Sequence, residues 1–590
     1  MERDSVKLER KWDLRSLIKD NEEYEQLFAQ VKQGIEKLKK WEGKLTPDNA
    51  LECLKSQSNT SRILEKIYTF TLLQLDENVA NSKNQRLAER VKMLAVEFYQ
   101  ASSFIDTELA AFSEKELQAM RSDPLFSNFD RALLKIIRSK KHILSAKEEK
   151  IMASLQSFSG EFKNIFSMFN NVDIKFEDVV DTDGNIVKMS HGNFSMLLHY
   201  ASQRVRQDAF ISNYKAFEGV ISTLSATYAG NVKKNCMIAK VRNYSSAMEM
   251  SLFDEAIDPK VYDNLIENVR ANLPKLHEYI GIRKKLLGLS EFHQYDLYVP
   301  IVQEIEIALE YEDAFALVQS ALLPLGQGYR KVLKKAYSER WIDVEETKNK
   351  RSGAYSWSCY DAHPFILLNY KKIPADIFTI AHELGHAMHS YYSNANQCYE
   401  KATYEIFLAE IASTVNEVLV LKYLMRDASP LLKKFLLAYY VDMFRSTVFR
   451  QTQFAEFEKF AHQSNEAGEP LTMEMLCEFY YKLNREYYGR TPIYDEYIKY
   501  EWARIPHFYN AFYVYKYATG LISAVSIAKG LLTDKSGKKR EQYLKFLSSG
   551  GSQDPLDILK IVGIDLLDNK VFEDAFAELA TTLSQLKEEL

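Results

Sequence analysis

Hydrophobic and polar positions alternate along this chain with the period of an α-helix over most of its length. From about residue 15 to 170, apolar residues recur at spacings of three and four with charged residues between them, as in NEEYEQLFAQVKQGIEKLKKWEG. This pattern predicts a stack of helical hairpins. Helical spacing returns from about residue 194 to 335 and again from about residue 374 to the C-terminus, and a short extended segment is expected within EFHQYDLYVPIV. The fold is therefore predicted to be mainly α.

Two stretches depart from the helical period. VDIKFEDVVDTDGNIVKM, residues 172 to 189, alternates with a period of two around Asp-Thr-Asp-Gly, which predicts a β-hairpin. We place a domain boundary there, with an N-terminal helical lobe over residues 1–190 and a second domain over residues 191–590. SGAYSWSCYDAHPFILLNY, residues 352 to 370, is rich in Tyr, Ser and β-forming residues and predicts a small edge sheet, although irregular core structure fits it equally well.

The next stretch, DIFTIAHELGHAMHSYYS, is expected to form one helix, and it contains His382, Glu383 and His386 as an HExxH motif. Residues four apart on a helix lie on one face, about 6 Å apart along the axis. Both imidazoles can therefore bind one zinc ion, while the glutamate can reach a water on the metal without being a ligand. With 11 histidines in the chain, such a motif arises by chance in roughly one or two comparable chains in a hundred.

A tetrahedral zinc ion needs one more protein ligand besides two histidines and a water. The metzincin arrangement fails, because the chain has His389 and Tyr392 where that motif requires glycine and histidine. His389 is better explained as a residue of the helix face or as a partner of the ligands. Glu410 lies among the apolar residues of FLAEIAS, where a carboxylate needs a compensating cation, so we expect it to be the third ligand. Glu417 shares its helix face and either orients a zinc-bound histidine or is an ordinary solvated acid.

Composition limits the remaining classes of function. The net charge is −5, from 76 basic and 81 acidic residues, which gives no electrostatic case for nucleic acid or an anionic membrane. The start is charged, and no apolar run approaches the length of a membrane span, so a cytoplasmic location is expected. The five cysteines are far apart and lack CxxC spacing, so they are interpreted as reduced thiols, with Cys359 and Cys398 as packing residues rather than nucleophiles.

A last cluster lies in RIPHFYNAFYVYKYATG, residues 504 to 520. The segment contains His507, and Tyr509, Tyr513 and Tyr517 recur every four residues, which predicts that these three tyrosines share one helical stripe. Such a stripe is more often core packing. Peptide hydrolysis, however, develops negative charge on a carbonyl oxygen, and Tyr and His donors can stabilise that charge.

These motifs together resemble the oligopeptidase F and thimet oligopeptidase family of zinc metallopeptidases, and the oligopeptidase F branch fits best. The resemblance covers most of the chain. It is carried by KWDL, DTDGN followed by HGNF, GAYSWSCYDAHPFILLNY, AHELGHAMHS, FLAEIAS with its acid 24 residues after His386, and IPHFYNAFYVYKYATG.

The resemblance implies a mainly helical, two-lobed metallopeptidase with a deep central channel and a small antiparallel β-sheet near the active site. It implies that residues 191–590 form the catalytic domain, which hydrolyses internal bonds of short unfolded peptides. The implied site has one Zn²⁺ per chain on His382, His386 and Glu410, Glu383 as the base, His507 and Tyr517 as donors to the substrate, and substrate contacts from Tyr509, Tyr513, Gly353, Ala354 and Tyr355.

Two rival functions stay open. A metallo-carboxypeptidase or dipeptidyl carboxypeptidase would need a basic group for the terminal carboxylate, and Arg504 is available. A helical peptide-binding protein with a vestigial site is the non-enzyme alternative, which the complete water-activating set disfavours. Aminopeptidases of the GxMEN type are disfavoured because the motif does not occur in this chain. The oligomeric state, monomer or homodimer, is not predicted.

Overall fold

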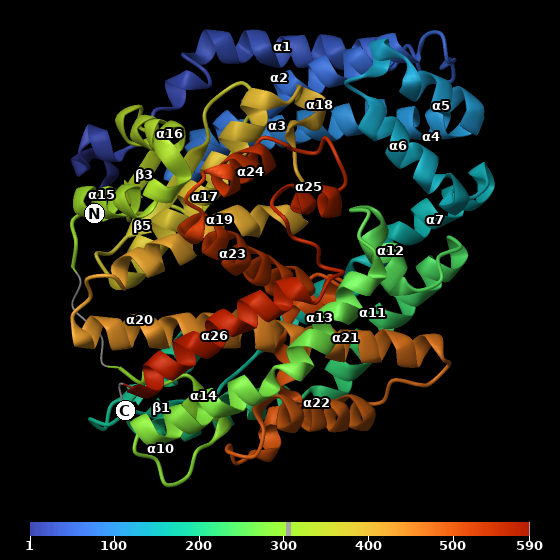
Figure 1. Cartoon of the computed structure of the whole chain (residues 1–590). Coiled ribbons are helices and arrows are strands. Elements are labelled where there is room, and N and C mark those ends of the chain that lie inside the picture. The colour runs from blue at the N-terminus through green and yellow to red at the C-terminus, as the bar shows by residue number, and fades with distance from the viewer. Residues whose placement is uncertain (303–307, 589–590) are drawn as a thin grey trace. The chain divides into compact units, whose positions relative to one another are not determined.

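The computed structural model describes residues 1–302 and 308–588, and helices make up most of it (Figure 1). The predicted mainly helical fold is confirmed. The chain forms two compact units, each built from three separate stretches. The first unit comprises Met1–Lys141, Glu306–Leu424 and Ala524–Ile564, and the second comprises His142–Ile305, Met425–Ser523 and Asp565–Leu590. The domain boundary expected near residue 190 stays a prediction.

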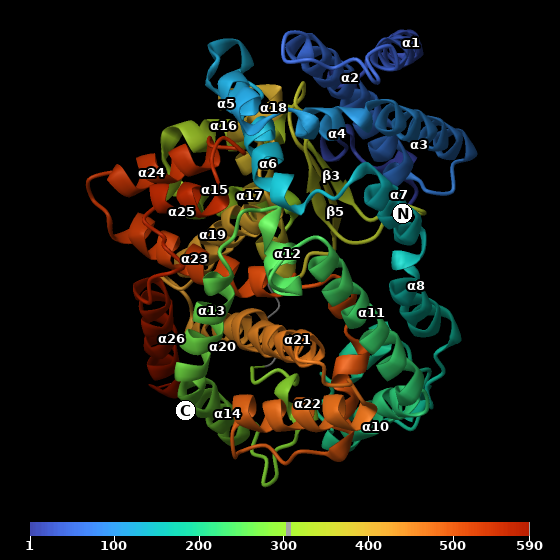
Figure 2. The same ribbon diagram turned by 90° about the vertical axis from the view of Figure 1, so that its right-hand side faces the viewer.

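The first unit begins with a layer of antiparallel helices. Its helices are α1 (Asn21–Leu38), α2 (Ala50–Glu77), α3 (Ser82–Ser102), α4 (Phe104–Ala111), α5 (Glu114–Ser122), α6 (Asp130–Ser139), α15 (Tyr311–Ala321), α16 (Gly326–Ser338), α17 (Pro374–Asn396), α18 (Tyr399–Ala402), α19 (Ile406–Leu424), α24 (Lys538–Leu547) and α25 (Pro555–Ile561). Helices α1, α2 and α3 lie side by side in both views (Figures 1 and 2). The side chain of Asp20 caps α1 by accepting the backbone N–H of Glu23, and the helix buries Tyr24, Phe28 and Val31 at the spacing that the sequence predicts.

The predicted sheet within residues 352–370 is present in the first unit. Strands β4 (Tyr355–Trp357) and β5 (Phe365–Tyr370) pair antiparallel, as expected. A third strand that the sequence did not indicate, β3 (Ile342–Glu345), pairs parallel to the other side of β5. The strand order is β3-β5-β4, which places β4 at the edge of the sheet. On β5, Phe365 and Leu367 join the hydrophobic core that also holds residues of α1, α2 and α3.

The second unit is also helical. Its helices are α7 (Ala146–Ser159), α8 (Glu161–Met168), α9 (His191–Leu197), α10 (Gln203–Glu218), α11 (Ile221–Val241), α12 (Ala247–Phe253), α13 (Pro259–Ala271), α14 (Leu273–Leu286), α20 (Pro430–Met443), α21 (Arg450–Glu466), α22 (Met473–Tyr488) and α26 (Lys570–Glu588), and α23 (Tyr515–Thr533) has residues in both units. Helices α20 and α26 run side by side in both views. A π-helical segment, Phe444–Phe449, directly joins α20 to α21.

The hairpin predicted around Asp-Thr-Asp-Gly is confirmed. Strands β1 (Val179–Val180) and β2 (Ile186–Val187) pair antiparallel. Asp181 Oδ1 accepts the backbone N–H groups of Asp183 and Asn185, at 2.9 and 2.8 Å, which closes the turn. Gly184 has φ +87°, a conformation that glycine adopts without strain.

The prediction of an extended segment within EFHQYDLYVPIV is wrong for most of its length. Residues Gln294–Leu297 form a 3₁₀ turn, and only an isolated bridge pairs His293 with Ile493. The reason is a buried ion pair, because Asp296 accepts both the backbone N–H of His293 at 2.8 Å and the guanidinium of Arg206 at 2.7 Å. These two bonds hold the backbone in a turn.

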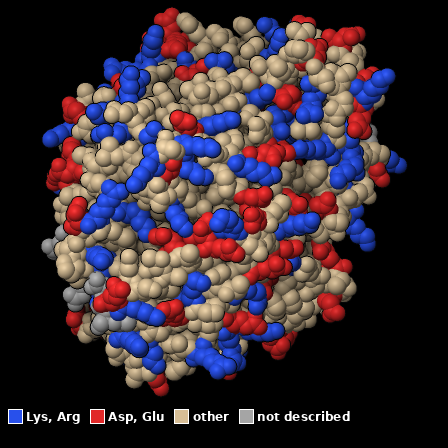
Figure 3. All heavy atoms as spheres, in the orientation of Figure 1, with Lys and Arg blue, Asp and Glu red and all other residues tan. Residues whose placement is uncertain are grey.

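The surface carries charges of both signs. Figure 3 shows Lys and Arg interspersed with Asp and Glu over the face that it displays, in agreement with the nearly balanced composition. Within the described residues, no helix combines the length and the hydropathy that crossing a membrane requires.

Candidate active site

The site of the first unit is built where α17 crosses α19. A Cβ added to Gly385, the fourth residue of the HExxH motif, would lie 2.4 Å from the Cα of Ser413 on α19. Only glycine permits this close approach of the two backbones. Ser413 lies between Glu410 and Glu417 in sequence, so the contact brings one acid to each side of the two histidines. Sequence reasoning missed the role of Gly385, although a glycine inside a helical pattern is a signal for such an approach.

A second contact that the sequence analysis missed fixes the same pair of helices. Asn416 is fully buried, and its amide N–H donates to the carbonyl of Ala381 on α17 at 3.1 Å. The amide also donates to the hydroxyl of Tyr329 on α16 at 3.1 Å. A buried amide in the apolar run of α19 was the available signal, because buried polar groups are almost always hydrogen-bonded. Asn416 thus anchors the helix directly beside Glu417.

Three possible metal ligands converge in this crossing. His382 Nε2 lies 3.1 Å from His386 Nε2, and Glu410 Oε2 lies 3.6 and 3.9 Å from these two nitrogens. Within the described residues, these three side chains form a group able to hold a metal ion. A zinc ion bound tetrahedrally at about 2.0–2.1 Å from each donor separates the donors by about 3.3 Å. Two imidazoles, one carboxylate and these separations therefore fit a zinc ion.

Glu417 makes direct contact with the first histidine. Its Oε1 lies 2.7 Å from His382 Nδ1, and its side chain is only 15% exposed. Burial alone would lower the pKa of His382, but the hydrogen bond and the charge of Glu417 raise it to about 9. With Nδ1 bound to the carboxylate, Nε2 is the nitrogen left to face His386 and Glu410.

Glu383 is held in a desolvated position on the same helix. The residue is 7% exposed, and its Oε2 has no hydrogen-bond partner. Burial raises the pKa of Glu383 to about 7, and the charges of Glu410 and Glu417 act in the same direction, whereas the charge of His382 and the backbone N–H of Ser356 oppose them. A carboxyl group with a pKa near neutrality can both accept and return a proton at physiological pH.

The two remaining histidines of α17 differ in their surroundings. Burial, followed by the charge of His382, lowers the pKa of His386 to about 3, which favours the neutral imidazole that a metal requires. His389 is buried between two rings, with centroids 3.6 Å from Tyr404 and 5.3 Å from Phe546. Burial lowers the pKa of His389 to about 3 as well. The ring contacts give His389 a packing role, and its proposed role as a partner of the ligands stays a prediction.

Gly353, Ala354 and Tyr355, the residues predicted to contact the substrate, form the start of strand β4 and the two positions before it. Gly353 has φ +85°, and its carbonyl accepts the side-chain amide of Asn369 on β5 at 2.7 Å. Ala354 follows, and the hydroxyl of Tyr355 donates to Asp76 on α2 at 2.6 Å. These anchors fix the edge strand to the rest of the first unit.

The tyrosine cluster belongs to the second unit, and the helical stripe predicted for it is wrong. Residues Pro506–Tyr509 form a 3₁₀ turn, and α23 begins only at Tyr515. The positive φ of Phe512, 54°, interrupts the helix between them. This interruption of the helix determines which of the tyrosine side chains are in contact.

Because the helix is interrupted, three of the four residues predicted to act on the substrate, His507, Tyr513 and Tyr517, lie close together. The hydroxyl of Tyr517 lies 3.4 Å from His507 Nε2, and the rings of Tyr513 and Tyr517 have centroids 5.5 Å apart. Burial lowers the pKa of His507. Tyr509 points elsewhere, and it stacks on Phe166 with centroids 4.8 Å apart.

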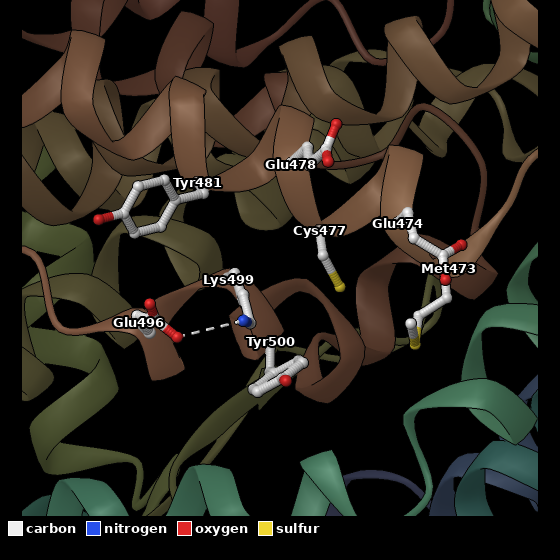
Figure 4. A pocket seen from close by; sticks show the side chains of 8 residues that line it. All are labelled: Met473, Glu474, Cys477, Glu478, Tyr481, Glu496, Lys499 and Tyr500. Carbon is white, nitrogen blue, oxygen red and sulfur yellow. Dashed lines mark ion pairs between the residues drawn. The ribbon is translucent and has the colours of Figure 1, made fainter.

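The second unit also has a cavity of about 330 Å³ between α22 and the 3₁₀ segment Glu496–Arg504. Figure 4 shows Glu474 and Glu478 beside it, and Glu496 paired with Lys499 at 3.6 Å. Cys477 lines this cavity, but burial raises the pKa of its thiol, so the reactive thiolate is disfavoured. Cys477 is therefore disfavoured as a nucleophile.

Comparison with known proteins agrees with the chemistry of this site. The chain matches the family models described as Peptidase family M3, over residues 196–578, and Oligopeptidase F, over residues 108–176. Oligopeptidase PepF of Bacillus subtilis is 38% identical over 600 residues, which covers 100% of this chain and 89% of the relative. An oligoendopeptidase F homolog of Lactococcus lactis is 35% identical, covering 98% of this chain and 96% of the relative.

Solved structures agree as well. The crystal structure of oligoendopeptidase-F from Enterococcus faecium superposes with a TM-score of 0.75 at 32% identity, covering 96% of this chain and 99% of that one. The chain therefore belongs to peptidase family M3, in its oligopeptidase F branch, and is a metallopeptidase that acts as an endopeptidase on oligopeptides.

Proposed function

We propose that this chain is a zinc-dependent endopeptidase that cleaves internal bonds of short unfolded peptides, with Glu383 as the general base. The observation that carries the proposal is the convergence of His382, His386 and Glu410 beside that buried glutamate. An acid that is only structural is normally paired with a cation or solvated, whereas this one has an unpartnered oxygen next to two further acids and two histidines.

The metal is proposed to be held by His382 Nε2, His386 Nε2 and Glu410. Glu417 supports the first ligand by fixing its ring and increasing its basicity through the 2.7 Å contact with Nδ1. When bound, zinc supplies Lewis acidity, which polarises the peptide carbonyl and lowers the pKa of the attacking water. A site with three protein ligands leaves a coordination position for the reaction.

Glu383 moves the proton. Its unpartnered Oε2 accepts a proton from the attacking water and then delivers it to the nitrogen of the leaving amine. The pKa of about 7 supports this cycle, because neither the charged nor the neutral form is strongly favoured. The backbone N–H of Ser356 contacts the same carboxylate and orients it.

The peptide is proposed to bind by adding a strand to the edge formed by Gly353, Ala354 and Tyr355. An edge strand offers unpaired backbone groups, which recognise any extended peptide irrespective of its sequence. The bond between Tyr355 and Asp76 keeps this edge in place. Folded proteins cannot present an extended strand in this way, which limits substrates to short unfolded peptides.

His507 and Tyr517 are proposed as donors to the carbonyl oxygen of the substrate, where charge develops during attack. Their 3.4 Å contact supports a joint role. Tyr513, which stacks with His507, is proposed to contact the substrate with them. Tyr509 is proposed for the same role, although its stacking on Phe166 favours packing.

The carboxypeptidase alternative depended on Arg504 as a free cation. The guanidinium of this residue instead lies 3.1 Å from Glu501 and donates to the hydroxyl of Tyr214 at 3.3 Å. The relatives are named as oligopeptidases or oligoendopeptidases, which favours internal cleavage. The cytoplasmic location stays a prediction, and fractionation of cells would check it.

A mixed library of short peptides, blocked at both ends and analysed by mass spectrometry, tests the proposal. Internal cleavage that stops with a chelator and returns with zinc is expected, with one zinc per chain by elemental analysis. Cleavage that requires a free carboxyl terminus would favour the carboxypeptidase, and binding without any cleavage would favour a peptide-binding protein.

A further inference from the structure

A cavity of about 250 Å³ lies in the first unit between the sheet and the first turns of α17, a feature that the proposed mechanism does not use. Its apolar walls come from Ala354, Leu368 and Ile380. Its volume corresponds to roughly eight waters at about 30 Å³ each. This space fits one extended side chain such as that of lysine or arginine, and we refer to it as the Asp376 cavity.

Several hydrogen-bond acceptors on the residues that line the Asp376 cavity are not used by the bonds within the protein. Oδ2 of Asp376 accepts the backbone N–H groups of Lys371 and Ile373, at 2.8 and 3.1 Å. The amide N–H of Asn369 is used by the carbonyls of Arg351 and Gly353, at 2.9 and 2.7 Å.

The hydroxyl of Thr379 likewise donates to the carbonyl of Ala375 at 3.1 Å. The second carboxylate oxygen of Asp376, the amide oxygen of Asn369 and the hydroxyl oxygen of Thr379 are further acceptors on residues that line the cavity. The side chains of these three residues therefore offer more acceptors than donors, which favours a donor-rich ligand.

The charges around the cavity also favour a cationic ligand. Lys371, the cation that lines the cavity, is 59% exposed and lies 3.6 Å from Glu346, so its charge is already offset at the surface. Within the described residues, no cation forms an ion pair with Asp376. An ammonium or guanidinium group entering the cavity would supply the missing partner, and charged hydrogen bonds of this kind are among the stronger ones.

The position of the cavity on α17 relates it to the bond that is cleaved. Thr379 precedes Glu383 by four residues on the same helix face, which corresponds to about 6 Å along the axis. An extended peptide advances about 3.3 Å per residue, so the cavity lies about two residues from the cleaved bond.

The direction of β4 decides on which side of the bond the cavity lies. This strand runs from Ala354, at the cavity, toward Ser356, whose backbone N–H contacts Glu383. A peptide added antiparallel to β4 therefore runs from Glu383 toward the cavity. Antiparallel addition is the commoner arrangement and continues the pairing of β4 with β5.

We propose that the Asp376 cavity binds the side chain of the second residue on the carboxyl side of the cleaved bond and selects lysine or arginine there. This inference rests on the proposed function, because it requires the peptide to bind along β4. It adds a substrate preference, which the backbone contacts alone would not give.

The test uses blocked, internally quenched peptides that differ only at that second residue, which is lysine, norleucine or glutamate. For the wild-type zinc enzyme, kcat/KM for the lysine peptide should exceed that for the norleucine peptide by about tenfold, since a hydrogen bond to a charged group typically contributes that much. The glutamate peptide should be the poorest substrate. Asp376→Asn keeps an oxygen for the backbone N–H groups at the start of α17 but removes the charge, so the ratio of kcat/KM between the lysine and norleucine peptides should fall to about one.

Asp258→Asn is the control, because the side chain of Asp258 also accepts a backbone N–H at the start of a helix, α13 of the second unit. It should leave the lysine preference intact. If Asp376→Asn fails to fold, Thr379→Val removes one acceptor without changing the shape and should reduce the preference. Efficient cleavage without any lysine preference would overturn the inference alone, and lysine preference two residues before the bond would overturn the assigned direction. Absence of cleavage of all three peptides would instead contradict the proposed function.

Discussion

The ion cluster around Glu501 in the second unit and the cluster of acids around the HExxH histidines in the first unit are completed in opposite ways. In the second unit, Glu501 is 2% exposed, and its two oxygens accept hydrogen bonds from Arg450 at 2.6 Å and Tyr480 at 2.7 Å, with Arg504 at 3.1 Å. Burial alone would raise the pKa of Glu501, but the charges of the two arginines lower it to about 2. The charge and the hydrogen-bond acceptors of Glu501 are thus paired entirely by protein side chains.

Around the HExxH motif of the first unit, three glutamates face two histidines. Glu383, Glu410 and Glu417 surround two histidines, and Glu383 keeps an unpartnered oxygen and a pKa raised to about 7 by burial. The difference shows how to distinguish a structural ion network from a functional one. All acceptors of the structural network are paired within the protein, whereas the group proposed to be functional lacks the positive charge that a metal ion would bring.

The largest effect is expected from removing the base in the open cluster. Glu383→Gln preserves the shape of the side chain but cannot accept a proton, so kcat should fall by about 10²–10⁴-fold. Elemental analysis should still find one zinc per chain, because Glu383 is not a proposed ligand. Glu474→Gln, which changes an exposed acid of the second unit, is the control and should turn over peptides normally. A fully zinc-loaded Glu383→Gln variant with normal kcat would remove this residue from the mechanism.

In the closed cluster, the same chemical change should affect stability. Glu501→Gln leaves Arg450 and Arg504 buried without their counter-charge, and breaking a buried pair typically costs about 3–5 kcal/mol. Urea unfolding should show this loss of stability, with zinc affinity unchanged. Glu496→Gln is the control in the same 3₁₀ segment, where the side chain is 88% exposed, and it should unfold like the wild type. Equal stability of both variants would contradict the view that the cluster is structural.

The local sequence pattern was enough to predict most helices and strands and to propose the metal ligands. The HExxH spacing and the apolar surroundings of Glu410 concern single helices, whose periodicity is visible in the sequence. The same holds for the antiparallel pair β4–β5, whose strands are close in the chain. Sequence analysis could therefore name the three side chains, His382, His386 and Glu410, that the structure brings together.

What sequence analysis missed depends on contacts between distant segments. The approach of Gly385 to Ser413, and the bond from Asn416 to Ala381, require knowing which helices cross. The four-residue spacing of the tyrosines after His507 was misleading, because a positive φ at Phe512 interrupts the helix. Such a backbone conformation in a phenylalanine has no sequence signal, since tertiary contacts impose it.

Glu458 tests whether a raised pKa alone identifies a functional acid. It is fully buried in the second unit, accepts the backbone N–H of Phe512 at 2.8 Å and has an unpartnered second oxygen. Burial raises its pKa to about 8 from the ordinary value of 4.5. It therefore resembles Glu383 in protonation, but it is not part of a group of metal ligands.

The sign of the pH effect follows from the raised pKa. Below pH 4.5 the carboxyl is protonated in both states, and between pH 4.5 and about 8 only the unfolded chain releases the proton. Stability should thus fall as the pH rises through this window, by about 3 kcal/mol at pH 7. Glu458→Gln should remove this component of the slope in urea unfolding measured from pH 4.5 to 8, without changing kcat. An unchanged slope would show that the residue ionises in the folded protein.

The smallest effect is expected from Glu417, the acid proposed to support a metal ligand without binding the metal. Glu417→Gln replaces a charged partner of His382 Nδ1 with a neutral one, which should weaken zinc binding by about 10–100-fold. We expect the lower end of this range, because His386 has a hydrogen bond to the backbone of Ala409 that the substitution leaves intact. Competition with a fluorescent chelator measures the affinity, and saturating zinc should restore most of the turnover. Glu458→Gln, the same change at a buried acid away from the ligands, should bind zinc like the wild type. Wild-type affinity in Glu417→Gln would make this acid a packing residue, and turnover that zinc cannot restore would place it among the groups that touch the substrate.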